Sequence, residues 1–239
     1  GPYPLTVLGC DADIAAGLTR LKAADLVSVV LVLDDRLRPA MTVLESAPVT
    51  VRQFKPHYVH DRSLGPVSYG KHHRYELRRA LARTEVSEIS LADHLPDWER
   101  LYGALMARHG LGGLHGFPPV HHETLAGLAS LRTFGAFIDG RLVSAHLFVT
   151  HDGHAMSHLA ASAAEGYQSG AAYAVNDLAL TELTDCAGIN FNSVEPSYLF
   201  TAILDGDAYT ALSAGSADSG FFPAYRGPRP QERSDEHQG

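Results

Sequence analysis

Two Asp-Gly dipeptides constrain the fold of this chain more than any other feature of its sequence. Asp139-Gly140 and Asp152-Gly153 each separate two runs in which apolar residues alternate with other residues. Asp-Gly favours a type I′ turn, because that turn needs a positive φ at both central residues. The sequence therefore predicts a three-stranded antiparallel meander, with strands over residues 133–138, 141–150 and 154–161.

Helices and one further strand are expected around this meander. Apolar residues at helical spacing predict helices over residues 91–109 and 121–131 before it. After it, a run rich in Gly, Ser and Ala leads into a helix over residues 173–187 and a strand over residues 189–194. Such a junction presents backbone N–H groups at the positive end of a helix dipole, which suits a pyrophosphate group.

The first half of the chain predicts a helix followed by short strands. The helix is expected at residues 11–24, and proline residues separate strands expected at residues 27–33, 41–44, 49–54 and 57–61. A second helix, over residues 69–83, carries the concentrated positive charge of the chain on one face, at Lys71, Arg74 and Arg78.

Composition excludes several classes of protein. The chain has 239 residues, of which 45% are hydrophobic, and a formal net charge of −8. An acidic balance argues against broad attraction to nucleic acid, and no apolar run reaches the ~18 residues of a membrane span. The two cysteines, Cys10 and Cys186, are too far apart to form a CxxC pair. We expect a soluble cytoplasmic protein without membrane contact.

The 14 histidines raise the question of a metal site. His151 and His154 flank the second Asp-Gly turn, whereas His158 lies four residues further along the strand, roughly 13 Å away at ~3.3 Å per residue. The adjacent pairs at 72–73 and 121–122 are expected to point in different directions, and neither forms an HExxH motif. We therefore expect no metal cofactor.

The order helix, helix, meander, small-residue loop, helix, strand resembles that of the GNAT acyltransferase superfamily. Within it the chain is more similar to the Fem-like branch, which includes bacterial acetyltransferases. The resemblance is carried by four segments, namely residues 54–61, residues 71–83, Arg108-His109, and His158-Leu159-Ala160-Ala161 followed by Gly166-Tyr167. It implies an α/β fold of the α+β type, with a mixed, mostly antiparallel sheet flanked by helices.

The resemblance also implies a domain organisation. Fem-like proteins carry two GNAT-like halves, and residues 1–67 look like a shortened first half. A basic linking helix would follow at residues 68–85 and a GNAT acyltransferase domain at residues 86–227. The remaining residues, 228–239, are expected to form a flexible tail.

An acyl-CoA co-substrate, most simply acetyl-CoA, is implied by the same resemblance. Its pyrophosphate would lie on the small-residue loop, at Gly166, Tyr167, Gln168, Ser169, Gly170, Ala171 and Ala172. The implied activity is transfer of the acetyl group to the amine of a small amino-acid-like or hydrazine-like metabolite. Arg108, His109 and Arg74 are candidates for binding this acceptor.

Acyl transfer to an amine needs a base, an oxyanion donor and a proton for the departing thiolate. In GNAT enzymes the reaction takes place where two strands part, here the third meander strand and the strand expected at residues 189–194. His158 is expected mid-strand, on one face with Met156 and Ala160, and is the candidate base. Glu195 is the rival base, and Tyr198 could protonate the thiolate.

Two other functions stay open at this point. The basic face of residues 71–83 suits an enzyme that takes its acyl group from aminoacyl-tRNA, as Fem-like transferases do, although the net charge favours a CoA thioester. Alternatively, the chain is an inactive GNAT-like subunit that binds ligands or partners without catalysis.

Overall fold

The computed structural model describes residues 8, 11–34, 38–53, 59–110, 116–191 and 197–203. The chain divides into two compact units. The larger contains Gln53–Ser197, and the smaller contains Val7–Arg52 together with the segment that begins at Tyr198. Each unit is described by itself.

The larger unit is built on a six-stranded sheet of order β3-β8-β7-β6-β5-β4. Its strands are antiparallel except that β7 and β8 run parallel, which confirms the expected mixed, mostly antiparallel sheet. The strands are β3 (Val59–Asp61), β4 (Glu85–Ile89), β5 (Leu131–Ile138), β6 (Arg141–His151), β7 (His154–Ser162) and β8 (Gly188–Asn190).

Both Asp-Gly turns form as the sequence predicts. Asp139 and Gly140 have φ angles of 50° and 73°, and Asp152 and Gly153 have φ angles of 47° and 68°. Positive φ at both central residues of each turn lets β5, β6 and β7 follow one another as antiparallel neighbours. The predicted meander is confirmed.

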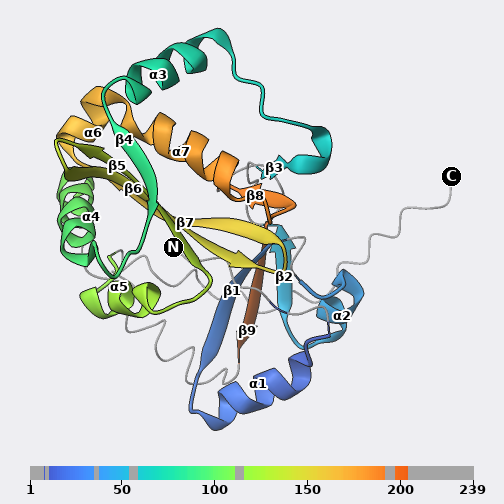
Figure 1. Ribbon diagram of the computed structural model, residues 1–239. Helices are drawn as coiled ribbons and strands as arrows, with labels where there is room; N and C mark the ends of the chain where they lie inside the picture. The colour runs from blue at the N-terminus through green and yellow to red at the C-terminus, as the bar shows by residue number, and fades with distance from the viewer. Residues whose placement is uncertain are drawn as a thin grey trace, which may run out of the picture. The chain divides into compact units, whose positions relative to one another are not determined.

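Helices cover both faces of this sheet (Figure 1). Their bounds are α3 (Lys71–Leu81), α4 (Leu95–His109), α5 (Pro119–Ala126), α6 (Ala164–Ser169) and α7 (Ala171–Glu182). Val175 and Ala179 of α7 are buried in one core with Phe134 and Phe148. The other core joins α4 and α5 to the opposite face and includes Trp98, Leu101, Leu125 and Leu147. The sheet thus separates an α7 layer from an α4–α5 layer.

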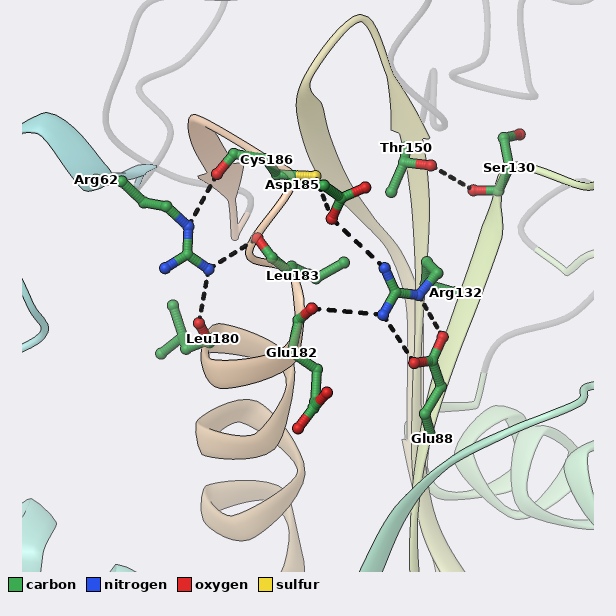
Figure 2. Close-up of polar contacts among 10 residues, drawn as sticks. All are labelled: Arg62, Glu88, Ser130, Arg132, Thr150, Leu180, Glu182, Leu183, Asp185 and Cys186. Atoms are coloured by element: carbon green, nitrogen blue, oxygen red, sulfur yellow. Dashed lines mark hydrogen bonds and ion pairs between the residues drawn. The ribbon is translucent and has the colours of Figure 1, made fainter.

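An arginine fastens β3 to the end of α7. Arg62, which follows β3, donates from Nε to the carbonyl of Cys186 at 2.9 Å and from Nη2 to the carbonyls of Leu180 and Leu183, each at 2.8 Å (Figure 2). The last carbonyls of a helix have no partner within the helix itself. One guanidinium therefore satisfies three acceptors where α7 ends and the chain turns toward β8.

A second arginine, Arg132, contacts the segment between α7 and β8 from the side of β5. Arg132 of β5 makes a two-pronged ion pair with Glu88 of β4, and its Nη1 lies 3.6 Å from the carboxylate of Asp185 (Figure 2). It also donates to the carbonyl of Glu182 at 3.5 Å. The two arginines thus tether the segment after α7 from both sides.

The smaller unit contains a three-stranded sheet of order β1-β9-β2 and two helices. Its elements are α1 (Ile14–Ala23), β1 (Ser28–Asp34), α2 (Met41–Ser46), β2 (Thr50–Gln53) and β9 (Ser197–Ile203). The prediction of a strand over residues 41–44 is wrong. Met41 and Leu44, three residues apart, lie on one side of a helical turn and pack in the core with Leu33.

The sequence analysis did not predict two strands, β4 and β9. β4 is mostly exposed and gives only a weak apolar pattern. Because β3 pairs with β8 and α3 packs on α7, residues 59–81 group with the larger unit. Residues after 197 group with the smaller one.

Replacing Arg62 by Lys is expected to destabilise the larger unit by about 1–3 kcal/mol, because an ammonium cannot satisfy three carbonyls held by a planar fork. The measurement is the midpoint of urea unfolding. Arg83→Lys, at an exposed position after α3, is the matched control and should leave the midpoint unchanged. Equal stability of the Arg62 variant and the wild type would show that the α7 end does not depend on this contact.

Candidate functional site

The strands β7 and β8 part soon after they meet. Their parallel pairing joins His154, Ala155 and Met156 to Gly188, Ile189 and Asn190. β7 continues to Ser162, whereas β8 ends at Asn190. Within the described part of the chain, the edge of β7 beyond Met156 therefore has no paired strand, and this is where the sequence analysis places the reaction.

A β-bulge places His158 at this parting. Leu147 of β6 pairs with Leu159, and Phe148 pairs with Ser157, so that His158 is the extra residue. A bulge breaks the alternation of side chains along a strand. Met156 and Ala160 consequently lie on opposite faces, and the prediction that both share the face of His158 is wrong.

His158 faces α5 and contacts a second histidine there. Its Nε2 lies 3.0 Å from Nε2 of His121, and the ring of Phe117 stacks on His121 with centroids 4.2 Å apart. One of the two Nε2 atoms must carry a hydrogen and the other a lone pair. The His158 side chain is buried, and its Nδ1 is also buried and has no hydrogen-bond partner among the described residues.

Burial keeps His158 neutral. Desolvation is the largest effect, and together with His121 and His122 it lowers the pKa of His158 to about 4. Burial also lowers the pKa of His121. At neutral pH both imidazoles are therefore uncharged, and each has one nitrogen that can accept a proton.

His121 is the functional residue that the sequence analysis did not select. The expectation that His121 and His122 point in different directions is confirmed, since His121 faces His158 while His122 packs against Trp98 and Tyr102. The adjacent pair in the sequence carried no sign of which ring would meet β7. Only the position of α5 on the sheet brings His121 to His158.

A polar network lies on the other face of the sheet, toward α7. His146 of β6 is buried, with Nδ1 2.8 Å from Oδ1 of Asn176 and Nε2 2.7 Å from Oγ of Ser157. Burial lowers its pKa to about 4, against the opposing effect of the Asn176 hydrogen bond. Because Asn176 accepts at Oδ1, Nδ1 carries the hydrogen and Nε2 accepts from Ser157. The network holds Ser157, the first β7 residue beyond the paired segment.

The predicted small-residue loop is mostly helical. Residues 164–169 form α6, and only Gly170, with a φ of 75°, separates α6 from α7. The left-handed Gly170 is a typical C-cap and ends α6. Within α6, Gly166 is pressed against β6, since a Cβ there would lie 2.2 Å from the carbonyl oxygen of Val143.

The N-terminus of α7 is the remaining place where this segment offers free backbone donors. Gly170 is its N-cap, no side chain caps it, and Ala171 and Ala172 open the helix. Arg79 of α3 lies beside this end, donating to the carbonyl of Gln168 at 2.6 Å and pairing with Glu76 at 2.8 Å. The pairing offsets the acidic charge of Glu76 next to Gly170.

The predicted acceptor residues lie at two places. Arg108 stacks on the ring of Tyr167, 3.8 Å from its centroid, and so joins the end of α4 to α6. His109 is exposed at the last position of α4. Arg74 is exposed on α3 and donates to the carbonyl of Tyr69. No described contact links any of these three side chains to His158.

Two predicted catalytic residues cannot be placed. Glu195 lies outside the described residues. Tyr198 belongs to the backbone of β9, but its side chain lies outside the description. Their proposed roles as rival base and as proton donor remain predictions.

A separate cavity of about 560 Å³ lies between residues 60–69 and α7. Its polar lining includes Tyr69, whose hydroxyl donates to Oδ1 of Asp177 at 2.8 Å. Burial and this carboxylate raise the pKa of Tyr69, so the phenol stays protonated. None of the predicted site residues lines this cavity.

The described residues contain no cluster of three or more His, Cys, Asp or Glu side chains that could hold a metal ion. Over the same residues, no helix combines the length and apolar character needed to cross a membrane.

No family model matches the sequence, and no curated protein matches it. Solved structures do share its fold. The C-terminal domain of a predicted lysylphosphatidylglycerol synthetase from Agrobacterium fabrum superposes with a TM-score of 0.61 at 11% identity, covering 90% of this chain and 79% of that chain. FemX gives a TM-score of 0.61 at 10% identity, covering 83% and 77%. L-PGS from Bacillus licheniformis gives 0.60 at 10% identity, covering 84% and 76%.

These similarities show the fold. The chain has the GNAT acyltransferase fold, with FemX and the two synthetase structures among its neighbours. The fold that the resemblance implied is confirmed.

The low pKa values of His146 and His158 predict that stability falls as the pH is lowered. An unfolded imidazole binds a proton near pH 6.5, whereas these two rings resist protonation until about pH 4. Protons therefore bind preferentially to the unfolded chain below pH 6.5, and stability is lost between pH 6.5 and pH 4. Urea unfolding at pH 7 and pH 5 measures this loss.

In a His158→Gln variant the loss between pH 7 and pH 5 should shrink, by on the order of 1–2 kcal/mol. His151→Gln, at an exposed position of the β6–β7 hairpin, is the matched control. An undiminished loss in the His158 variant would mean that this ring is not held neutral by the fold.

Proposed function

We propose that this protein is an N-acyltransferase that moves an acetyl group from acetyl-CoA to the amine of a small metabolite, amino-acid-like or hydrazine-like in character. The observation that carries the proposal is the position of His158. A neutral, buried imidazole lies on β7 two residues beyond the last pairing with β8. In the GNAT fold the thioester lies where these two strands part.

Direct attack by the amine suits the groups found there. The amine nitrogen adds to the thioester carbonyl, and the tetrahedral intermediate then expels the CoA thiolate. The amine must lose a proton as it attacks, and the neutral imidazole of His158 is the candidate base for it. Backbone N–H groups on the parted edge of β7 are suitable donors for the oxyanion.

The donor phosphates are assigned to the start of α7. A helix of 12 residues without a capping side chain offers unpaired N–H groups and the positive end of its dipole. Ala172, which is exposed and has a short side chain, leaves room for a pyrophosphate at this end. The ion pair of Arg79 with Glu76 keeps the Glu76 carboxylate from repelling the phosphates.

Isothermal titration with acetyl-CoA tests the donor, and His158→Ala tests the base. The variant should bind acetyl-CoA as tightly as the wild type but turn over about 10²-fold more slowly or worse, because general bases contribute on that scale. His151→Ala is the control variant. If turnover is unchanged in His158→Ala, the base is Glu195 or water.

A second donor has one specific observation in its favour. The exposed basic side chains Lys71, Arg74 and Arg78 of α3 lie on the helix that packs along α7 and touches α6 through Arg79. A basic surface beside the donor end suits the phosphates of an aminoacyl-tRNA. One structural neighbour is named as a lysylphosphatidylglycerol synthetase, which is consistent with this alternative.

Salt dependence separates the two donors. If charged tRNA is the donor, its affinity should fall steeply with salt, and replacing Lys71, Arg74 and Arg78 by Gln should reduce the slope of log K against log salt by up to about 0.7–0.9 per lost phosphate contact. Arg20→Gln with Lys22→Gln on α1 is the control. If wild-type protein binds acetyl-CoA and not tRNA, the tRNA alternative is excluded. If it binds neither, the inactive binding subunit is the better description.

A further inference from the structure

The cavity beside α7 is lined by side chains of opposite charge. It has a volume of about 560 Å³ and lies between residues 60–69 and the second half of α7. Small-molecule sites span roughly 300–1,000 Å³, so a cavity of this volume can hold a metabolite. Among its described lining residues, Arg62 and Asp177 are the charged ones, and they come from the two different segments. Their surroundings indicate what kind of molecule the cavity accepts.

The Arg62 guanidinium is only partly used by the protein. Its Nε and Nη2 donate to three main-chain carbonyls, and no described contact occupies Nη1, which points away from those carbonyls (Figure 2). Within the described part of the chain, no carboxylate pairs with this charge. A carboxylate accepts from a guanidinium N–H more strongly than a neutral carbonyl does. Nη1 is therefore an available donor for a carboxylate ligand.

The Asp177 carboxylate is half-buried and, among the described residues, has no cation as a partner. Its Oδ1 accepts from the hydroxyl of Tyr69 at 2.8 Å. Burial and this hydrogen bond raise the pKa of Tyr69, so that the phenol remains a neutral donor. The negative charge of Asp177 is thus left without an opposite charge, which is unfavourable in a partly buried position. An ammonium group in the cavity would supply that charge.

The rest of the described lining is uncharged. Burial and the nearby charge of Arg62 lower the pKa of His60, against the opposing effect of Asp61, so this imidazole is neutral at pH 7. Val67 and Leu180 supply apolar surface. The cavity therefore offers one cation, one anion and an apolar wall.

We infer that this cavity binds a small zwitterion, an amino acid or a dipeptide, whose carboxylate accepts from Nη1 of Arg62 and whose ammonium group pairs with Asp177. A ligand with a single charge would leave one of the two side chains without an opposite charge. An apolar ligand side chain would pack against Val67 and Leu180. The site is separate from the proposed acyl transfer, because the cavity lies along α7 whereas His158 faces α5 on the other side of the sheet.

Isothermal titration of the wild-type protein, without any acyl donor, tests the site with L-leucine and with L-leucyl-L-leucine. At least one of them should bind, and which one binds reports how far apart the two charged contacts lie. The N-acetyl and carboxamide derivatives of the zwitterion that binds should each bind about 10-fold more weakly or worse, because each loses one charge-assisted hydrogen bond. If neither zwitterion binds at millimolar concentration, or if a derivative binds as tightly as its parent, the inference is wrong.

The variant Asp177→Asn tests the ammonium contact. Asparagine keeps an acceptor oxygen for Tyr69 but carries no charge, so the affinity for the zwitterion should fall about 10-fold or more while the midpoint of urea unfolding stays close to that of the wild type. Asp93→Asn, at an exposed position before α4, is the matched control and should bind like the wild type. Equal affinity of Asp177→Asn and the wild type would overturn the inference. Neither measurement depends on acyl transfer, so the site and the proposed function can fail separately.

The comparison with the two derivatives decides the question by itself if Asp177→Asn does not fold.

Discussion

The hydrogen bonds of the Arg62 guanidinium hold the part of the structure on which the candidate site depends. Arg62 donates to three carbonyls at and just after the end of α7, and these hydrogen bonds fix the turn that leads into β8 (Figure 2). β8 is only three residues long and is held on its outer side by β3, the strand that Arg62 follows. A strand so short can accompany β7 only at its beginning. The parting of the two strands is therefore a consequence of where β8 is anchored and how soon it ends.

Different polar side chains lie on the two faces of the sheet where β7 and β8 part. His158, displaced by the bulge, faces the α4–α5 layer and meets His121, while Ser157 faces α7 and is held by His146 and Asn176. Ser157 and His158 point to opposite faces, as neighbouring strand residues do, and the bulge keeps Leu159 on the same face as His158. In the proposed reaction, the acceptor amine would approach from the histidine side and the donor would lie along α7.

Local sequence signals predicted the meander, because Asp-Gly turns and alternating apolar residues act over a few positions. They also predicted α4 and the mid-strand position of His158. They could not predict the β-bulge, since it depends on how β6 and β7 fit each other, and so they misassigned Ala160 to the face of His158. The contact of His121 with His158 depends on how α5 docks. The expected loop is instead a helical turn, α6, which ends at Gly170 in the left-handed conformation typical of a helix C-cap. Residues 41–44 were misread because a short amphipathic turn and a short strand give similar apolar patterns.

The order β1-β9-β2 also determines when the smaller unit can finish folding. β9 lies between β1 and β2, so these two strands cannot complete their sheet until the chain has been made as far as Ile203, about 150 residues after β2 ends. At roughly 5–20 residues per second, the ribosome takes on the order of 8–30 s to supply it. During that interval β1 lacks β9, the strand with which it pairs. The β5–β6–β7 meander, whose contacts are local, has by then been synthesised. The strands β1 and β2 thus reach their final pairing only after residues about 150 positions later have been made.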